Sequence, residues 1–313
     1  MRNAFADEVT KLAVEDRRLV MLSGDIGNRL FDDFKAKAPE RFINCGIAEA
    51  NMMSMAGGMA LAGLKPVAYT ITPFVTTRCL EQIRVDVCYH NVPVTIVGVG
   101  SGLSYASLGA THQSCEDIAF LRALPNMTVL APADPFEVRG ALRLAMAHDG
   151  PLYMRLGKKG EKKIHTATPE MKPGGSITVR EGRDVCLLSV GVMLPSCIEA
   201  AERLAGSGIS TQVVSLYSIK PLDTAMLDQA FERYAAVLTV EEHSRIGGAG
   251  GAIAEWLSDG PPRRARFGRV GTQDHFMHEN AHTEYARQHH GLDVEGIVAS
   301  VRRALGQPAA AAQ

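Results

Sequence analysis

One stretch of the chain decides the fold, and it reads Asn44-Cys45-Gly46-Ile47-Ala48-Glu49-Ala50-Asn51-Met52-Met53. From Gly46 to Gly63 nearly every residue is Ala, Met, Leu or Gly, which predicts a helix that is apolar on all its faces and therefore buried. Small residues that permit close packing occur along it at Ala56, Gly57, Gly58 and Ala60. The stretch predicts a core helix with one acid, Glu49, at its entrance.

Glu49 needs an explanation, because a carboxylate in apolar surroundings is costly unless it is paired, protonated or used. The simplest interpretation places it in the first turn of the helix, where the positive end of the helix dipole favours an acid. Capping does not explain why an uncharged helix long enough to cross a core follows the acid. Position alone leaves both a capping role and a functional role open.

The composition bounds the possible functions. The chain has 313 residues, of which 46% are hydrophobic and 21% charged, which suffices for two domains of about 150 residues each. A formal net charge of -1 provides no basic field for nucleic acid or anionic lipid, and no apolar run reaches membrane length. The first residues form a charged amphipathic pattern rather than a signal peptide, so we expect a cytoplasmic protein.

Cysteine and histidine spacing does not predict a metal centre. The six cysteines form no CxxC pair, and most lie in apolar segments where a thiol behaves as a small hydrophobe. His275, His278 and His282 have spacings that a metal could use, but no cysteine or clustered acid accompanies them. A solvated loop or helix face is the preferred interpretation for these histidines.

The first half of the chain alternates strand and helix patterns. Apolar runs predict strands over residues 19–22, 65–70, 93–99, 127–130 and 152–156, with helical patterns over 46–63, 81–89, 116–124 and from Pro135. Asp134 is placed to cap the last of these helices, with Pro135 at its first position. This alternation predicts a doubly wound, mostly parallel α/β domain over residues 1–160.

A change of composition marks the end of that domain. Residues 161–182 are rich in Lys, Pro and Gly and are predicted to be a linker. A smaller α/β domain is predicted over 183–313, with strands at 185–190, 211–215 and 236–240 and helices at 194–204, 222–231, 250–256 and 294–305. The fold class is thus α/β with two unequal domains.

Several motifs resemble one family when they are taken in chain order. They are Leu22-Ser23-Gly24-Asp25-Ile26, Gly46-Ile47-Ala48-Glu49, Pro73-Phe74 with Glu81-Gln82-Ile83-Arg84, Gly109-Ala110-Thr111-His112-Gln113 with Glu116-Asp117-Ile118, Leu124-Pro125-Asn126-Met127-Thr128-Val129, and Val240-Glu241-Glu242-His243. Together they resemble the C-terminal half of transketolase, as found in bacteria that divide this enzyme between two polypeptides. The resemblance covers nearly the whole chain.

The resemblance implies a thiamine diphosphate enzyme, in which this chain supplies the pyrimidine-binding domain and the small C-terminal domain. Glu49 matches the catalytic acid that hydrogen-bonds the aminopyrimidine ring of the cofactor. Phe74 matches an aromatic residue against that ring, although a core ring would also suit its position. Asp25 matches a residue near the cofactor.

Two further residues match substrate-binding positions of the family. His112 matches a catalytic, substrate-facing histidine, and as a histidine before a helix it would otherwise be a capping residue. Arg155 aligns with an arginine that holds the substrate phosphate, a task suited to its planar donor fork. A salt bridge at the end of a strand is the alternative for Arg155.

The chain departs from the family pattern at two positions. Ala50 stands where the family commonly has Gln, so one polar contact near the pyrimidine is absent. Leu108 replaces an aspartate that contacts a sugar hydroxyl. Because a site built to bond a hydroxyl rejects analogues without it, Leu108 predicts a donor or acceptor other than the ordinary pentose and hexose phosphates.

The resemblance also implies partners. The diphosphate-binding domain, with its metal-holding Gly-Asp-Gly and paired Asn, is not found in the sequence. We therefore expect a chain that is inactive alone and pairs with an N-terminal subunit, in an assembly with two copies of each. Mg²⁺ or Ca²⁺ would be held mainly by that subunit, and the substrates would be small sugars.

Three other functions compete with a ketol-transferring transketolase subunit. The beta subunit of a 2-oxo acid dehydrogenase shares the fold and the acid, but the loop Ala110-Thr111-His112-Gln113 and the run Glu241-Glu242-His243 favour transketolase. A thiamine diphosphate carboligase that starts from pyruvate, like 1-deoxyxylulose-phosphate synthase, usually carries both halves on one chain. A non-catalytic scaffold subunit would keep the fold without the chemistry.

Overall fold

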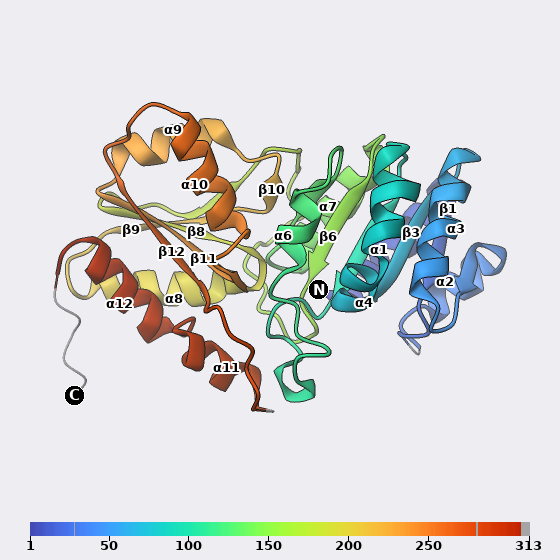
Figure 1. Cartoon of the computed structure of the whole chain (residues 1–313), viewed down its shortest axis with the longest axis horizontal. Coiled ribbons are helices and arrows are strands. Elements are labelled where there is room, and N and C mark those ends of the chain that lie inside the picture. Colours follow the sequence, from blue (N-terminus) through green and yellow to red (C-terminus); the bar gives the residue numbers. More distant parts are fainter. Residues whose placement is uncertain (28, 280, 308–313) are drawn as a thin grey trace.

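Two open sheets, each flanked by helices, form the frame of the computed structural model (Figure 1). The structure describes residues 1–27, 29–279 and 281–307. The end of the predicted second domain, residues 308–313, lies outside the described residues. The predicted α/β class, with a doubly wound domain followed by a smaller one, is confirmed.

The first sheet has seven strands in the order β10-β5-β6-β4-β3-β1-β2, and all are parallel except β10. Its strands are β1 (Leu19–Ser23), β2 (Phe42–Asn44), β3 (Lys65–Ile71), β4 (Thr95–Val99), β5 (Thr128–Leu130), β6 (Leu152–Leu156) and β10 (Ser218–Lys220). β1, β4, β5 and β6 are buried along their whole length, as their continuous apolar runs predict for parallel strands covered on both faces.

Helices cover both faces of this sheet. They are α1 (Arg2–Glu15), α2 (Asp32–Lys37), α3 (Glu49–Leu61), α4 (Thr72–Val75), α5 (Leu80–Gln82), α6 (Asp117–Arg122) and α7 (Pro135–Ala147), with short helices η1 (Pro39–Arg41), η2 (Thr77–Cys79), η3 (Ile83–Tyr89) and η4 (Ala106–Leu108). One core contains side chains of α1, α2 and α7, and the other contains side chains of α3, η3 and α6. Asp134 caps α7 by accepting from the backbone nitrogens of Phe136 and Glu137, both at 2.9 Å.

The second sheet has five strands in the order β12-β11-β8-β9-β7, of which only β7 is antiparallel. Its strands are β7 (Ile177–Arg180), β8 (Val185–Ser189), β9 (Thr211–Ser215), β11 (Ala236–Ser244) and β12 (Arg266–Thr272). The helices of this domain are η5 (Gly191–Met193), α8 (Leu194–Ala205), α9 (Thr224–Arg233), α10 (Ala249–Asp259), α11 (Thr283–His290) and α12 (Val294–Ala304). β11 extends past residue 240, where the sequence analysis ended this strand, and its added residues include Glu241, Glu242 and His243.

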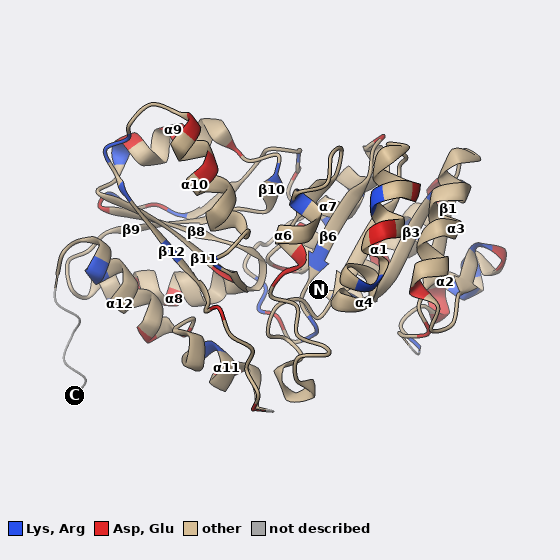
Figure 2. Ribbon diagram, viewed as in Figure 1, with Lys and Arg blue, Asp and Glu red and all other residues tan. Residues whose placement is uncertain are grey.

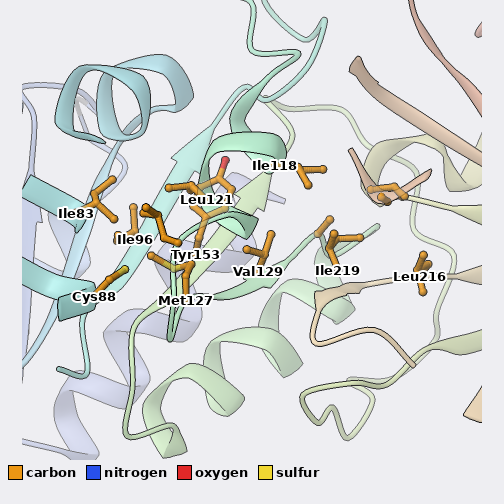
Figure 3. Close-up of a cluster of buried hydrophobic side chains, with 14 of the residues drawn as sticks. Ile83, Cys88, Ile96, Ile118, Leu121, Met127, Val129, Tyr153, Leu216 and Ile219 are labelled. Carbon is orange, nitrogen blue, oxygen red and sulfur yellow. The ribbon is translucent and has the colours of Figure 1, made fainter. Parts of the chain in front are cut away.

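The two domains share one hydrophobic core. β10 comes from the second half of the sequence but pairs with β5 at the edge of the first sheet. Figure 3 shows Ile219 and Leu216 in the same buried cluster as Val129, Ile118 and Tyr153. Because this apolar cluster runs from one sheet to the other, the domains are packed together rather than joined by the linker alone.

Two sequence predictions are corrected by the fold. The predicted linker, 161–182, contains β7, whose pairing with β9 gives it an ordered edge position in the second sheet. The helix predicted to be buried on all faces, α3, is covered on one face only: Met52, Met53 and Ala56 are buried, whereas Leu61 is exposed. Nearby Ile47 is 84% exposed and Tyr89 80% exposed.

The covered face of α3 packs as closely as its small residues predict. A Cβ atom built at Gly57 would lie 2.5 Å from the carbonyl oxygen of Asp86 in η3. Any side chain at Gly57 would therefore push α3 and η3 apart. Gly58, in contrast, faces open space.

Charges of both signs are interspersed over the two domains (Figure 2), in keeping with the formal net charge of -1. Within the described residues, no helix combines the length and apolar character needed to cross a membrane.

Candidate active site

The site residues lie at one edge of the first sheet, where the carboxyl ends of its parallel strands meet. Asp25 follows β1, Glu49 opens the helix after β2, and Phe74 lies in the helix after β3. The loop that carries His112 follows β4. Loops at the carboxyl ends of parallel strands are the usual ligand-binding edge of an open α/β sheet.

Glu49 is the first residue of α3 and is only 2% exposed. Its Oε2 lies 2.8 Å from Nη1 of Arg78, whose side chain is 47% exposed. A Cβ atom at Gly24 would lie 3.3 Å from Cγ of Glu49, so the absent side chain there lets the β1 loop approach the acid. The carboxylate is therefore buried in the interior of the chain. Its only ion-pair partner in the described residues, Arg78, reaches solvent.

Arg78 joins Glu49 to two aromatic side chains. Its guanidinium carbon lies 4.1 Å from the ring centroid of Phe74, within cation–π distance. The ring of Phe74 in turn meets that of His112 edge to face, with centroids 5.2 Å apart. The structure thus brings the predicted residues Glu49, Phe74 and His112 into one cluster, through an arginine that the sequence motifs did not single out.

His112 is half-buried in this cluster. Its Nδ1 lies 2.9 Å from Oγ1 of Thr111, and its ring is 5.9 Å from that of Tyr105. Burial, and then the positive charge of Arg78, lower the pKa of His112 below its ordinary value. The imidazole is therefore neutral at pH 7 and can both donate and accept a hydrogen bond.

Asp25 lies at the rim of the cluster and is exposed. Its backbone has φ of +55°, and its Oδ1 accepts a hydrogen bond of 2.9 Å from Nδ2 of Asn44. Asn44 in turn accepts from the backbone nitrogen of Gly46, which ties the β1 loop to the turn before α3. Asp25 is thus close to Glu49 along the sheet edge without contacting it.

Arg155 does not lie with the other predicted residues. Its side chain is 1% exposed, and its Nε lies 2.8 Å from Oδ2 of the buried Asp117. Its Nη2 donates to the carbonyl oxygens of Ser114 and Glu242, at 3.1 and 2.7 Å. These contacts occupy Nε and Nη2 of the guanidinium, and a contact of Arg155 with a substrate phosphate stays a prediction. The observed contacts match the alternative interpretation, a salt bridge at the end of a strand, and they link the two domains.

Glu242 anchors the loop that carries His112. Its Oε2 accepts from the backbone nitrogen of Leu103 at 3.0 Å, and its Oε1 accepts from Nε of Arg287 in α11 at 2.5 Å. A Cβ atom at Gly102 would lie 2.6 Å from the side chain of Glu242, so only glycine permits this approach. The second domain thus positions the active-site loop of the first.

Family models match both halves of the chain. The model "Transketolase, pyrimidine binding domain" matches residues 1–161, and "Transketolase, C-terminal domain" matches residues 174–297. The chain belongs to the transketolase family. The resemblance inferred from its motifs is confirmed, and its two domains are those of the transketolase subunit that the sequence predicts.

Similar proteins include other transketolase subunits. The 6-deoxy-6-sulfo-D-fructose transketolase subunit SqwH of Clostridium sp. (strain MSTE9) is 36% identical over 95% of this chain and 92% of its own. An apulose-4-phosphate transketolase subunit of Phocaeicola vulgatus is 35% identical over 95% of this chain and 94% of its own. A solved structure described as "Split gene transketolase, inactive beta4 tetramer" has a TM-score of 0.88, 35% identity and 97% coverage of both chains.

Two side chains that lie beside the candidate site were missed in the sequence. Arg78 follows Phe74 by one helical turn, a spacing that could have suggested the contact. Lys158 follows β6, and its Nζ lies 4.4 Å from the ring centroid of Tyr105. Leu108, the departure that the sequence did single out, lies in η4 and is 49% exposed, so its side chain is available to a bound molecule.

Proposed function

We propose that Glu49, Phe74 and His112 form this chain's half of a thiamine diphosphate site that is completed by a second subunit. The observation that carries the proposal is the buried carboxylate of Glu49 at the start of α3, paired with Arg78 in the same cluster as the half-buried rings of Phe74 and His112. A transketolase-type subunit with these groups supplies general acid–base and stacking contacts rather than a metal site of its own.

The residues fit the aminopyrimidine of thiamine diphosphate. Glu49 would hydrogen-bond a ring nitrogen, Phe74 would lie against the ring, and Asp25 would stand beside it. When bound, the cofactor would supply the nucleophilic carbon that attacks the carbonyl group of a ketose, so that the ketose can be cleaved. Because Glu49 is buried, its carboxylate is weakly screened and holds a partner strongly.

Arg78 occupies the carboxylate until such a ring replaces it. The arginine side chain is half exposed and can turn into solvent, whereas Glu49 cannot leave the interior. His112 would meet the substrate, since its neutral ring can donate to a carbonyl oxygen or accept from a hydroxyl. These are the groups of this chain that hold or move a proton.

We propose an N-terminal, diphosphate-binding partner subunit, with two copies of each chain in the active assembly. The exposed apolar residues on and beside α3 support a partner here, because Ile47, Leu61 and Tyr89 are large apolar side chains that a partner would remove from water. Similar proteins described as subunits support the same division. Mg²⁺ or Ca²⁺ would be held mainly by that partner, and a cytoplasmic location is proposed with it.

The substrate we propose is a ketose with a terminal anionic group, which gives a two-carbon unit to an aldose. Arg155 is buried, and Arg78 pairs with Glu49. We therefore propose Lys158, whose Nζ lies 4.4 Å from the ring centroid of Tyr105, as the cation that meets this group. Two similar proteins are named for a sulfonated and a phosphorylated sugar, and Leu108 gives this site an apolar contact where a carboxylate is usual. Whether the anionic group is a phosphate or a sulfonate, we propose that it forms an ion pair with Lys158.

Glu49→Gln tests the proposal in the presence of the partner subunit. The amide keeps the shape of the side chain but cannot hold a proton as the carboxylate does. We expect ketol transfer to fall at least about a hundredfold, and thiamine diphosphate binding, measured by fluorescence quenching, to weaken. Glu255→Gln is the matched control, because Glu255 is an exposed acid that pairs with Arg122 far from the site.

Two results would contradict it. Unchanged turnover in Glu49→Gln would leave the scaffold interpretation. Carbon dioxide release from pyruvate or another 2-oxo acid, without exchange between sugars, would instead favour a decarboxylating enzyme.

A further inference from the structure

Three histidines meet in the second domain, between α11 and the segment that follows β12. His275 lies in that segment, and His289 and His290 are the last residues of α11. Nε2 of His275 lies 3.2 Å from Nε2 of His289. Each of the three histidines offers one ring nitrogen, and these three nitrogen atoms all lie within 4.8 Å of one another. His290 is buried, and the other two are exposed.

Besides the approach of His275 and His289, the cluster has a hydrogen bond of 3.5 Å from the backbone nitrogen of Gln273 to Nδ1 of His290. In the described part of the chain, no Asp or Glu forms an ion pair with any of the three histidines. The neutral imidazole is the form that binds metal. Ring nitrogens bound to one tetrahedral zinc ion lie about 3.4 Å apart, given Zn–N bonds of about 2.0–2.1 Å.

We propose that His275, His289 and His290 bind one divalent transition-metal ion of the zinc class. Three imidazoles suit zinc, copper or nickel, and three protein ligands leave a fourth position open. His275 and His290 line a cavity of about 320 Å³ together with Asp274 and Glu116. The acids on this side favour a cation.

Arginines on the other side limit the affinity. Arg245, Arg269 and Arg303 line a second cavity, of about 370 Å³, with His289 and His290. All three are exposed, so their repulsion of a cation is screened over about 8 Å at physiological salt. We therefore expect a dissociation constant in the micromolar range rather than the nanomolar range of closed structural zinc sites.

The site lies on the helix that positions the active-site loop. α11 also carries Arg287, which holds Glu242, the anchor of Leu103. Ala110 and Gln113 of that loop line part of the cavity of about 320 Å³ beside His275 and His290. A bound metal would fix the segment after β12 against α11 at this point.

Calorimetric titration with zinc chloride tests the proposal on the full-length chain, freed of metal by a chelator and carrying no polyhistidine tag. We expect one zinc ion per chain. His275→Ala and His289→Ala change exposed residues and should each weaken binding at least tenfold. His278→Ala and His282→Ala are matched controls, because both are exposed histidines near the cluster but outside it. Cobalt(II) should give the visible absorption of a tetrahedral nitrogen site.

The controls decide between the outcomes. Loss of the zinc isotherm and the cobalt spectrum in His275→Ala and His289→Ala, with unchanged circular dichroism, supports the site. Absence of saturable zinc uptake overturns it. Zinc uptake that survives in both His275→Ala and His289→Ala would place the metal elsewhere and overturn the proposal. Loss of uptake in His278→Ala, or in Cys45→Ser, which removes a free thiol, would do the same.

Discussion

Two acid–arginine pairs in this chain have the same separation but opposite surroundings. Glu49 and Arg78 lie 2.8 Å apart, as do Asp117 and Arg155. Both acids are buried, but Arg78 is 47% exposed whereas Arg155 is 1% exposed. When the first pair opens, the arginine moves into water and only the acid stays in the interior, where a ligand can replace the arginine. When the second pair opens, two charges are left in the interior.

The comparison separates an exchangeable contact from a structural one. Arg155 has further bonds to carbonyl oxygens of the active-site loop and of β11, so it fixes the loop and the second domain together. Arg78 has one ion pair and one ring contact, both of which a ligand can replace. Exposure of the arginine, rather than the distance to the acid, distinguishes the two roles.

The largest effect is expected from breaking the buried pair. Arg155→Met leaves Asp117 charged and unpaired, and we expect the chain to lose about 3–5 kcal/mol of its free energy of unfolding. Urea denaturation measures the loss, and Asp117→Asn combined with Arg155→Met should recover part of it. If Arg155→Met instead keeps wild-type stability and only raises KM for an anionic ketose, Arg155 binds the substrate rather than stabilising the fold.

Acid should weaken the same pair. Burial raises the pKa of Asp117, but the charge of Arg155 and the hydrogen bonds from Arg155 and Tyr153 outweigh it and lower the pKa below its ordinary value. The pair's contribution is therefore complete above about pH 3.9 and is lost as the pH falls through the lower pKa of the folded chain. Urea midpoints of wild type and the double variant should converge on acidification.

Breaking the exchangeable pair should affect activity more than folding. In Glu49→Gln we expect the free energy of unfolding to change by less than about 1 kcal/mol, because Arg78 stays hydrated. The loss of ketol transfer with the partner subunit should far exceed this. Unfolding of the variant comparable to that of Arg155→Met would mean that the two pairs do not differ as their exposure indicates.

Lys158 sharpens the comparison by testing which cation meets the substrate. Lys158→Gln should raise KM for the anionic ketose about tenfold, roughly 1.4 kcal/mol, with little change in kcat. Lys162→Gln, in the same loop, is the control. An equal effect of both variants would indicate general attraction by the loop rather than a contact at Lys158.

The smallest effect concerns the charge of Arg78 on His112. The pKa of His112 is lowered by burial and by Arg78, so the acid limb of kcat/KM should lie below about pH 6.5. Arg78→Gln should move the pKa of His112 upward by removing one of these causes. Titration of the imidazole by NMR measures the shift, and no shift at all would show that burial alone sets it.

The sequence predicted the interior strands of both sheets and most of the helices, because continuous apolar runs indicate strands that are buried on both faces. It missed the edge strands β2, β7, β10 and β12, and it missed the helices α2 and α11. It also predicted α3 to be buried all round. An apolar helix face looks the same in sequence whether it meets its own chain or another protein.

The motifs placed Glu49, Phe74 and His112 in one site, and the structure groups them. Their catalytic roles stay predictions. Substrate binding by Arg155 also stays a prediction, and its salt bridge with Asp117 needed the structure, because strand position alone does not tell how a guanidinium is paired. The histidine cluster was invisible because His275 and the pair His289 and His290 are separated by a segment and a helix, so only their approach in space relates them.

The amino-acid order by itself determined the family, the two-domain α/β plan and the buried acid at the start of α3, because these depend on local patterns of apolarity and on short motifs. The tertiary structure alone decided which arginine reaches solvent, how the second domain holds the active-site loop, and which histidines meet. Those outcomes depend on long-range contacts and on access to water, which no local pattern encodes.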